Sequence, residues 1–126
     1  MNFFSKLFKK KASAETPPMP AWETVVEMMH DQQLNFIANE VMEVIYSTDR
    51  TMRYVILKDE RGFFTYQFEV LRQFDEDEWI YFGSRDNALP ATWDSFGGIK
   101  RISLFDTIEA LKKELQAEPE YNQYFR

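Results

Sequence analysis

The chain has 126 residues, a length that suits one globular domain with a single core. It is 44% hydrophobic and 29% charged, as in ordinary globular proteins, but 17% of its residues are aromatic, which is unusual. It contains no cysteine, which excludes disulfides, cysteine-ligated metals and thiol catalysis.

The first eleven residues predict a basic amphipathic segment. On a helix of about 100° per residue, one side is apolar and the other carries lysines. The apolar residues are Met1, Phe3, Phe4, Leu7 and Phe8, and the lysines are Lys6, Lys9 and Lys10. Such a segment suits a membrane surface or an acidic partner groove. It is also short enough to be a disordered end or one that packs on its own domain.

Residues 12–20 contain Pro17, Pro18 and Pro20 and predict an extended linker. The expected organisation is therefore a segment and linker over residues 1–20 and a globular domain over residues 21–126. Residues 1–20 carry four lysines and one glutamate, a net charge of +3, which leaves −9 on residues 21–126. An acidic body disfavours nucleic-acid binding through the domain and favours encounter with a basic protein.

A helix is predicted from Ala21 to about Gln33, because apolar residues recur there at helical spacing. Four strands follow, over residues 41–47, 52–58, 63–74 and 79–84, joined by polar turns at 48–51, 59–62 and 75–78. The third strand is the clearest. Phe64, Tyr66, Phe68 and Val70 alternate with polar residues, so one face is predicted to be buried and the other wetter.

Residues 85–98 predict an irregular loop that packs down, because it contains Leu89, Trp93 and Phe96. A short fifth strand is expected over residues 99–105. A second helix is predicted to begin at Asp106, with Glu109 at capping-box spacing, and to end before Pro119. Pro119 is expected to begin one last helical turn.

These elements predict an α+β single domain. Its expected core is an antiparallel β-meander of four to five strands, with an N-terminal and a C-terminal helix packed on the sheet. The helices are expected on the face of Phe64, Tyr66, Phe68 and Val70, although an arrangement on opposite faces is equally compatible with the pattern.

No catalytic, cofactor or metal motif is recognisable. His30 is the one histidine; it has no partner spacing for a triad, and its neighbour Asp31 is expected to point elsewhere. Gly97 and Gly98 lack the spacing of a phosphate loop and predict a turn. We therefore expect no enzyme activity, no cofactor and no metal.

The expected partner surface combines the outer face of the sheet with the acidic turn. Exposed tyrosine and tryptophan beside polar residues have the composition of a protein interface. The residues assigned to it are Tyr54, Gln67, Glu69, Asp75, Glu76, Asp77, Glu78, Trp79 and Tyr81. The alternative is that the loop of Trp93 and Phe96 covers this face.

In size, acidity and helix–meander–helix order the domain resembles small bacterial immunity or antitoxin-like proteins, which neutralise a toxin by covering it. The resemblance has no motif behind it and transfers no residues. The first hypothesis is a non-enzymatic acidic protein-binding module of immunity or inhibitor type, with a protein partner that is basic. The alternatives are a peripheral membrane protein tethered by residues 1–11 and a small-molecule binder with a pocket under the 85–98 loop. We expect a cytoplasmic protein, with peripheral contact at the inner membrane surface if the tether hypothesis holds.

Overall fold

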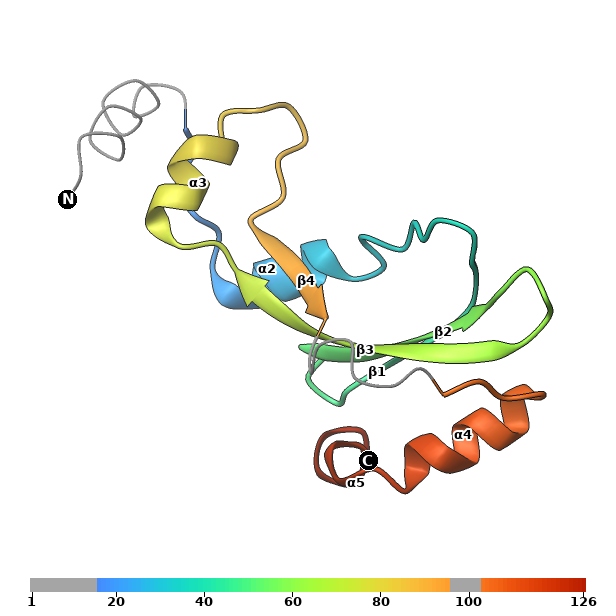
Figure 1. Cartoon of the computed structure of the whole chain (residues 1–126). Coiled ribbons are helices and arrows are strands. Elements are labelled where there is room, and N and C mark those ends of the chain that lie inside the picture. Colours follow the sequence, from blue (N-terminus) through green and yellow to red (C-terminus); the bar gives the residue numbers. More distant parts are fainter. Residues whose placement is uncertain (1–15, 96–102) are drawn as a thin grey trace. The chain divides into compact units, whose positions relative to one another are not determined.

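Four strands in chain order form one antiparallel sheet, and the fold is α+β (Figure 1). The computed structural model describes residues 16–95 and 103–126. The strands are β1 (Glu40–Tyr46), β2 (Met52–Lys58), β3 (Phe64–Gln73) and β4 (Ala91–Ser95), and the sheet order is β1-β2-β3-β4. The predicted meander is confirmed, and the first three strands agree with their predicted bounds to within a residue.

The predicted helices at the two ends of the domain are present as α2 (Trp22–Met29) and α4 (Ile108–Gln116), and Pro119 begins α5 (Pro119–Tyr124) as expected. The start of α4 differs from the prediction. Its cap is Thr107, whose hydroxyl accepts a hydrogen bond from the backbone N–H of Ala110 at 3.1 Å. Asp106 therefore lies one residue outside the cap.

The predicted strand over residues 79–84 is wrong, because this stretch belongs to a helix, α3 (Glu76–Phe82). The predicted turn at 75–78 is wrong for the same reason. Asp75 is the N-cap of α3 and forms a reciprocal capping box with Glu78. Two N–H groups at the start of the helix are satisfied in this way, which favours a helix over the strand that the aromatic residues suggested.

The fourth strand lies instead inside the predicted 85–98 loop, as β4. Of the predicted fifth strand, residues 99–102 lie outside the described residues, as do Gly97, Gly98 and Phe96. Phe105 forms an isolated antiparallel bridge with Phe64, through two backbone hydrogen bonds of 2.8 Å. The sheet thus continues at this point as a single bridge.

The chain divides into two compact units. The first, here called the α3 unit, is described over residues 16–32 and 72–92 and contains α2 and α3. The second, here called the sheet unit, is described over residues 33–71, 93–95 and 103–126. It contains β1, β2, most of β3, and the helices α4 and α5.

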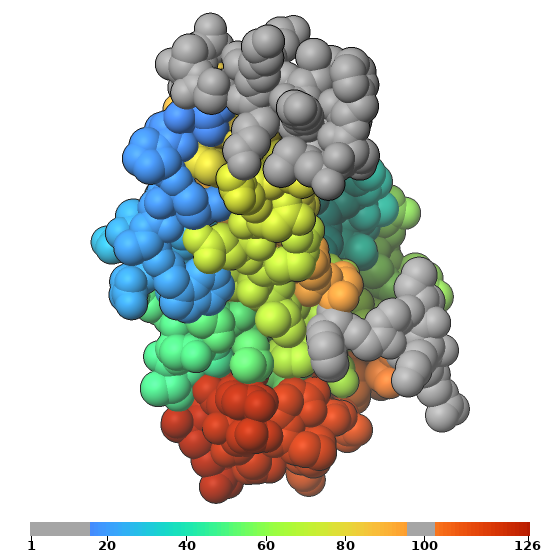
Figure 2. All heavy atoms as spheres, turned by 90° about the vertical axis from the view of Figure 1, so that its left-hand side faces the viewer, coloured from blue at the N-terminus to red at the C-terminus, as the bar shows by residue number. Residues whose placement is uncertain are grey.

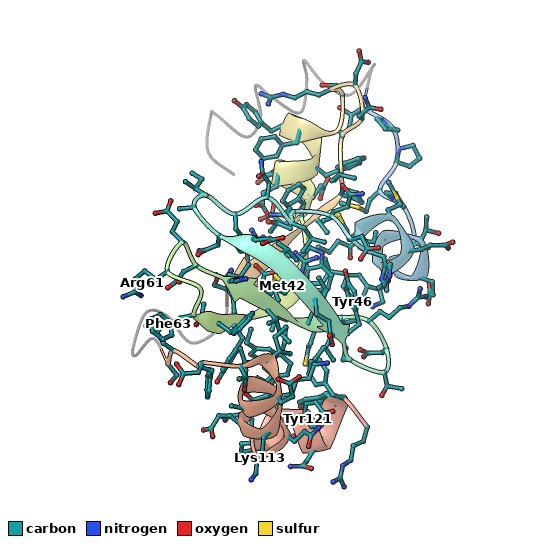
Figure 3. All side chains as sticks on the ribbon, turned by 90° about the vertical axis from the view of Figure 1, so that its right-hand side faces the viewer. Met42, Tyr46, Arg61, Phe63, Lys113 and Tyr121 are labelled. Carbon is teal, nitrogen blue, oxygen red and sulfur yellow. The ribbon has the colours of Figure 1, made fainter. Side chains whose placement is uncertain are left out.

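In the sheet unit, α4 and α5 cover one face of the sheet (Figure 1). The centre of this core consists of Tyr54 and Ile56 from β2 and Leu111 and Leu115 from α4, all essentially inaccessible to solvent. Phe64, Tyr66 and Phe68 of β3 pack against it while partly exposed, so these residues lie toward the core as predicted. The prediction of a wetter opposite face is wrong, because Glu69 and Leu71 on that face are buried. Lys113 of α4 points away from the sheet, as Figure 3 shows.

Candidate functional site

The structure places Tyr54 in the core and not on an exposed face. Its side chain is fully buried and contacts Phe68 and Phe125, with ring centroids 5.0 and 4.7 Å away. The expected exposure is wrong because of strand register. Tyr54 lies directly opposite Phe68, and opposite residues share a face of the sheet. Burial, together with the negative charge of Glu120, raises the pKa of Tyr54 far above its usual value.

Gln67 and Glu69 do lie on the other face, but they belong to a buried polar network. Arg53, opposite Glu69 in the register, donates from Nε to Glu69 Oε1 at 2.6 Å. Gln67 donates to the other carboxylate oxygen at 2.6 Å. The Arg53 side chain is 0% exposed and that of Glu69 5%. The expected exposure of Glu69 is therefore wrong, because a buried arginine sits opposite it.

Trp93 covers this network within the sheet unit. Its ring lies 4.2 Å from the guanidinium carbon of Arg53, and its backbone N–H donates to the side chain of Gln33 at 2.6 Å. Arg53 also donates to the carbonyl of Gln33 at 3.2 Å. Tyr46 meets Trp93 edge to face. The expectation that the Trp93 loop packs down on the sheet is correct for this residue.

The remaining predicted partner residues gather on α3, in the α3 unit. Asp75 at its N-cap and Glu76 and Asp77 in its first turn are exposed. Glu78 is half-buried and accepts a hydrogen bond from Arg72 at 2.9 Å. The hydrogen bonds from Arg72 hold the pKa of Glu78 below its usual value.

Trp79 and Tyr81 have different environments on α3. Trp79 is buried, at 7% exposure, and its indole N–H donates to the carbonyl of Pro17 at 2.8 Å. Tyr81 is 41% exposed, with the guanidinium carbon of Arg85 5.2 Å from its ring centroid. The predicted linker is thus in contact with α3 from Thr16 onward, since Thr16 also donates to the carbonyl of Ile80 at 3.4 Å.

A pocket of about 460 Å³ lies between this N-terminal stretch and α3; we call it the α3 pocket. Figure 2 shows the stretch that begins at residue 16, in blue, beside α3, in yellow. The lining of the pocket is mainly apolar, with Thr16, Gln73 and Glu76 as polar members. The lining residues are Thr16, Pro17, Pro18, Met19, Gln73, Phe74, Glu76, Trp79 and Ile80.

The α3 pocket was missed in the sequence for two reasons. Pro17, Pro18 and Met19 were assigned to a linker, and Trp79 and Ile80 to a strand. One signal was available. Asp75 and Glu78 have capping-box spacing directly before an apolar run, which indicates a helix with Glu76 and Ile80 one turn apart.

The structure also describes the surroundings of His30, the one histidine of the chain. The Nε2 atom of His30 lies 3.8 Å from the carboxylate of Asp31, so the expectation that Asp31 points elsewhere is wrong. Asp31 has left the helix with a positive φ of 62°, which turns its side chain back toward His30. In residues 16–95 and 103–126, no three acidic or histidine side chains are grouped so that they could hold a metal ion.

The basic segment lies outside the described residues, with its predicted contact residues Phe3, Phe4, Lys6, Leu7, Phe8, Lys9 and Lys10. Within the part of the chain that the structure describes, none of the helices has the length and hydropathy to traverse a bilayer. Comparison of the chain with protein-family models, curated proteins and solved structures finds no match.

Proposed function

We propose that the chain is a non-enzymatic protein-binding module that uses α3 and the α3 pocket. Its partner presents an apolar side chain flanked by basic residues. The observation that carries the proposal is the α3 pocket itself, a mainly apolar cavity of about 460 Å³ with Glu76 in its lining. Two further exposed carboxylates lie next to Glu76 in the chain, Asp75 at the N-cap and Asp77 in the first turn of α3.

The volume and lining of the α3 pocket suit an anchor side chain. Binding cavities for small groups are typically a few hundred Å³ and mainly apolar, with a few polar atoms. Interface anchors are most often aromatic side chains that fill such cavities. Pro17 and Pro18 form a stiff wall, and the hydrogen bond from Trp79 to Pro17 fixes that wall against α3. A preformed cavity lowers the ordering cost of binding.

The charge around the α3 pocket selects the residues beside the anchor. Asp75, Glu76 and Asp77 place three carboxylates at the N-terminal end of α3, on a body whose net charge over residues 21–126 is −9. Lysine or arginine next to the anchor would be attracted, and acidic residues repelled. An immunity- or inhibitor-type protein would use such a surface to cover a basic partner.

A pair of short peptides tests the proposal. The probe is acetyl-Lys-Lys-Phe-Lys-Lys-amide and its control has alanine in place of phenylalanine. The indole N–H resonance of Trp79 reports on the α3 pocket, and its shift on titration gives the affinity. Burial of a phenylalanine side chain is worth about 1.5–3 kcal/mol, so we expect the control to bind roughly 10- to 100-fold more weakly.

Two charge-neutralising variants distinguish binding at the α3 pocket from non-specific attraction of the basic peptide to the acidic protein. Glu76→Gln changes a lining residue, whereas Glu23→Gln changes an acidic residue in the first turn of α2, outside the lining. We expect Glu76→Gln to weaken the phenylalanine peptide about threefold and Glu23→Gln to have a smaller effect. Equal affinity for both peptides, or no movement of the Trp79 resonance, would refute the proposal.

The two alternatives remain predictions. Membrane tethering concerns residues 1–11, and no described residue bears on it. For a small-molecule site under the 85–98 loop, the α3 pocket offers no support, because its lining comes from residues 16–19 and 73–80.

A further inference from the structure

We infer that the α3 pocket has an occupant within the same chain, residues 1–11, which a partner must displace. The inference rests on the proposed function, because it assigns to the same pocket a ligand of the same chemistry. Three observations support it: the composition of residues 1–11, the place where the chain enters the α3 pocket, and the charge of α3.

Composition is the first observation. Residues 1–11 contain four lysines and no acidic residue, and their apolar side chains include three phenylalanines and one leucine. At helical spacing, the side of Phe4, Leu7 and Phe8 is apolar and the side of Lys6, Lys9 and Lys10 is basic. This is the combination that the α3 pocket and its carboxylates are suited to bind: an aromatic anchor with lysines beside it.

Connectivity is the second observation. Thr16 and Pro17 are themselves lining residues, so the chain that leads to residues 1–11 starts at the wall of the α3 pocket. Seven residues, 9–15, separate Phe8 from Thr16. At up to about 3.5 Å per residue they span about 25 Å, which is ample for a return into a cavity that begins at Thr16. No other apolar and basic segment of the chain is covalently closer to that wall.

The covalent tether also determines how tightly residues 1–11 must bind the α3 pocket in order to occupy it. Short flexible linkers give effective concentrations on the order of 1 mM. A segment with an intrinsic dissociation constant of about 100 μM would then occupy the α3 pocket about 90% of the time. The short basic segment need not be a tight ligand, and an external partner would bind roughly tenfold more weakly than to an open pocket.

Charge is the third observation. Asp75 at the N-cap and Glu76 and Asp77 in the first turn of α3 are exposed, and Glu76 lines the α3 pocket, whereas the sequence of residues 1–11 carries four lysines. Opposite charges within a few ångströms at a protein surface each add a fraction of a kcal/mol, and several together set the orientation of a bound segment. The occupied state is therefore expected to weaken as the salt concentration rises.

A spin label on the full chain tests the inference. The chain has no cysteine, so Ser5→Cys provides a unique attachment point. We expect the label to broaden the indole N–H resonance of Trp79 until most of its intensity is lost. The matched control carries the same label with Phe4→Ser, Leu7→Ser and Phe8→Ser. It keeps the tether and the lysines but lacks the anchors. We expect the Trp79 resonance to regain part of its intensity, because the tether alone still brings the label near Trp79 for part of the time.

Three results would overturn the inference. The first is equal broadening of Trp79 with and without the three serine substitutions, which would mean that tethering alone brings the label close. The second is broadening between two copies of the chain. It would be seen if a ¹⁵N-labelled chain without the spin label lost Trp79 intensity when mixed with a spin-labelled chain of natural isotope content. The third is broadening that Glu76→Lys leaves unchanged at low salt.

The peptide titration separates this failure from failure of the proposed function. If acetyl-Lys-Lys-Phe-Lys-Lys-amide shifts Trp79 equally in the wild-type chain and in the triple serine variant, the α3 pocket binds such partners but residues 1–11 do not occupy it. If the inference holds, the triple serine variant binds the peptide about tenfold more tightly than the wild-type chain. If neither chain binds the peptide, the proposed function itself fails.

Discussion

Replacement of Glu69 by leucine is expected to cost about 3 kcal/mol of unfolding free energy. Arg53 is 0% exposed and its Nε lies 2.6 Å from Glu69, so the substitution leaves a buried guanidinium without its counter-ion. Loss of one partner of a buried ion pair typically costs 3–5 kcal/mol. The lower end applies here, because Arg53 keeps the Gln33 carbonyl at 3.2 Å and the face of Trp93 at 4.2 Å.

The more conservative Glu69→Gln is expected to cost about 1–2 kcal/mol. The amide oxygen can still accept from Arg53, but a charge-assisted hydrogen bond becomes a neutral one. In addition, the amide nitrogen would then face the Gln67 nitrogen that now donates at 2.6 Å, so two donors would meet.

Urea denaturation followed by circular dichroism measures these losses. The double variant Arg53→Met with Glu69→Leu is expected to lose less than either single variant, because an apolar pair of similar volume removes both buried charges together. A control is Glu43→Gln, which breaks the half-exposed pair with Lys112 at 2.8 Å and is expected to cost less than about 1 kcal/mol. The reasoning is refuted if Glu69→Leu costs no more than Glu43→Gln.

Three further predictions concern α3 and the core. Asp75→Ala removes the capping box and is expected to lower the unfolding free energy by about 1 kcal/mol in urea denaturation, whereas Asp77→Ala, outside the box, should change it by less than about 0.5 kcal/mol. Gly83→Ala is expected to lower the unfolding free energy by about 1–3 kcal/mol and to shift the Trp79 indole resonance. The reason is that the added Cβ would lie 2.7 Å from the Trp79 carbonyl oxygen and 2.8 Å from the Trp79 ring. An unmoved resonance would contradict this packing. Tyr54→Phe is expected to improve stability at alkaline pH. Folding raises the pKa of Tyr54 above 10.0, the ordinary tyrosine value, so the stability contribution of the neutral phenol is complete below pH 10.0 and is lost as the pH rises above it. Phenylalanine has no group that titrates. Identical alkaline unfolding of both proteins would contradict the prediction.

The parts of the fold that local pattern determines were predictable. β2 and the turn after it follow from an apolar run that stops at Asp59-Glu60-Arg61-Gly62, and Pro119 begins a helix because its missing N–H costs nothing there. The faces of the strands are less predictable, because the pattern of one strand does not say which residues of its neighbour lie opposite. Once the turn at residues 59–62 sets the hairpin, Tyr54 falls opposite Phe68 and Arg53 opposite Glu69. Register, and not composition, therefore decides which residues are buried.

The candidate site failed for a different physical reason. Trp79, Tyr81 and Phe82 have high strand propensity, but propensity is a weak preference that hydrogen bonds at a helix start can overcome. The α3 pocket also depends on the contact between Pro17 and Trp79, which are 62 residues apart. No local pattern encodes a contact of that separation.

The Arg53–Glu69 pair has a consequence for misfolding. A shift of β2 against β3 by one residue would turn every side chain to the wrong face, and burial alone opposes it. A shift by two residues keeps each side chain on its face, so the apolar core distinguishes it poorly. That shift would place Arg53 opposite Leu71 and Glu69 opposite Val55, so the two charged groups would no longer face each other directly. The 2.6 Å contact between Arg53 and Glu69 therefore exists only in the native register, and its loss disfavours the nearest alternative alignment of the two strands.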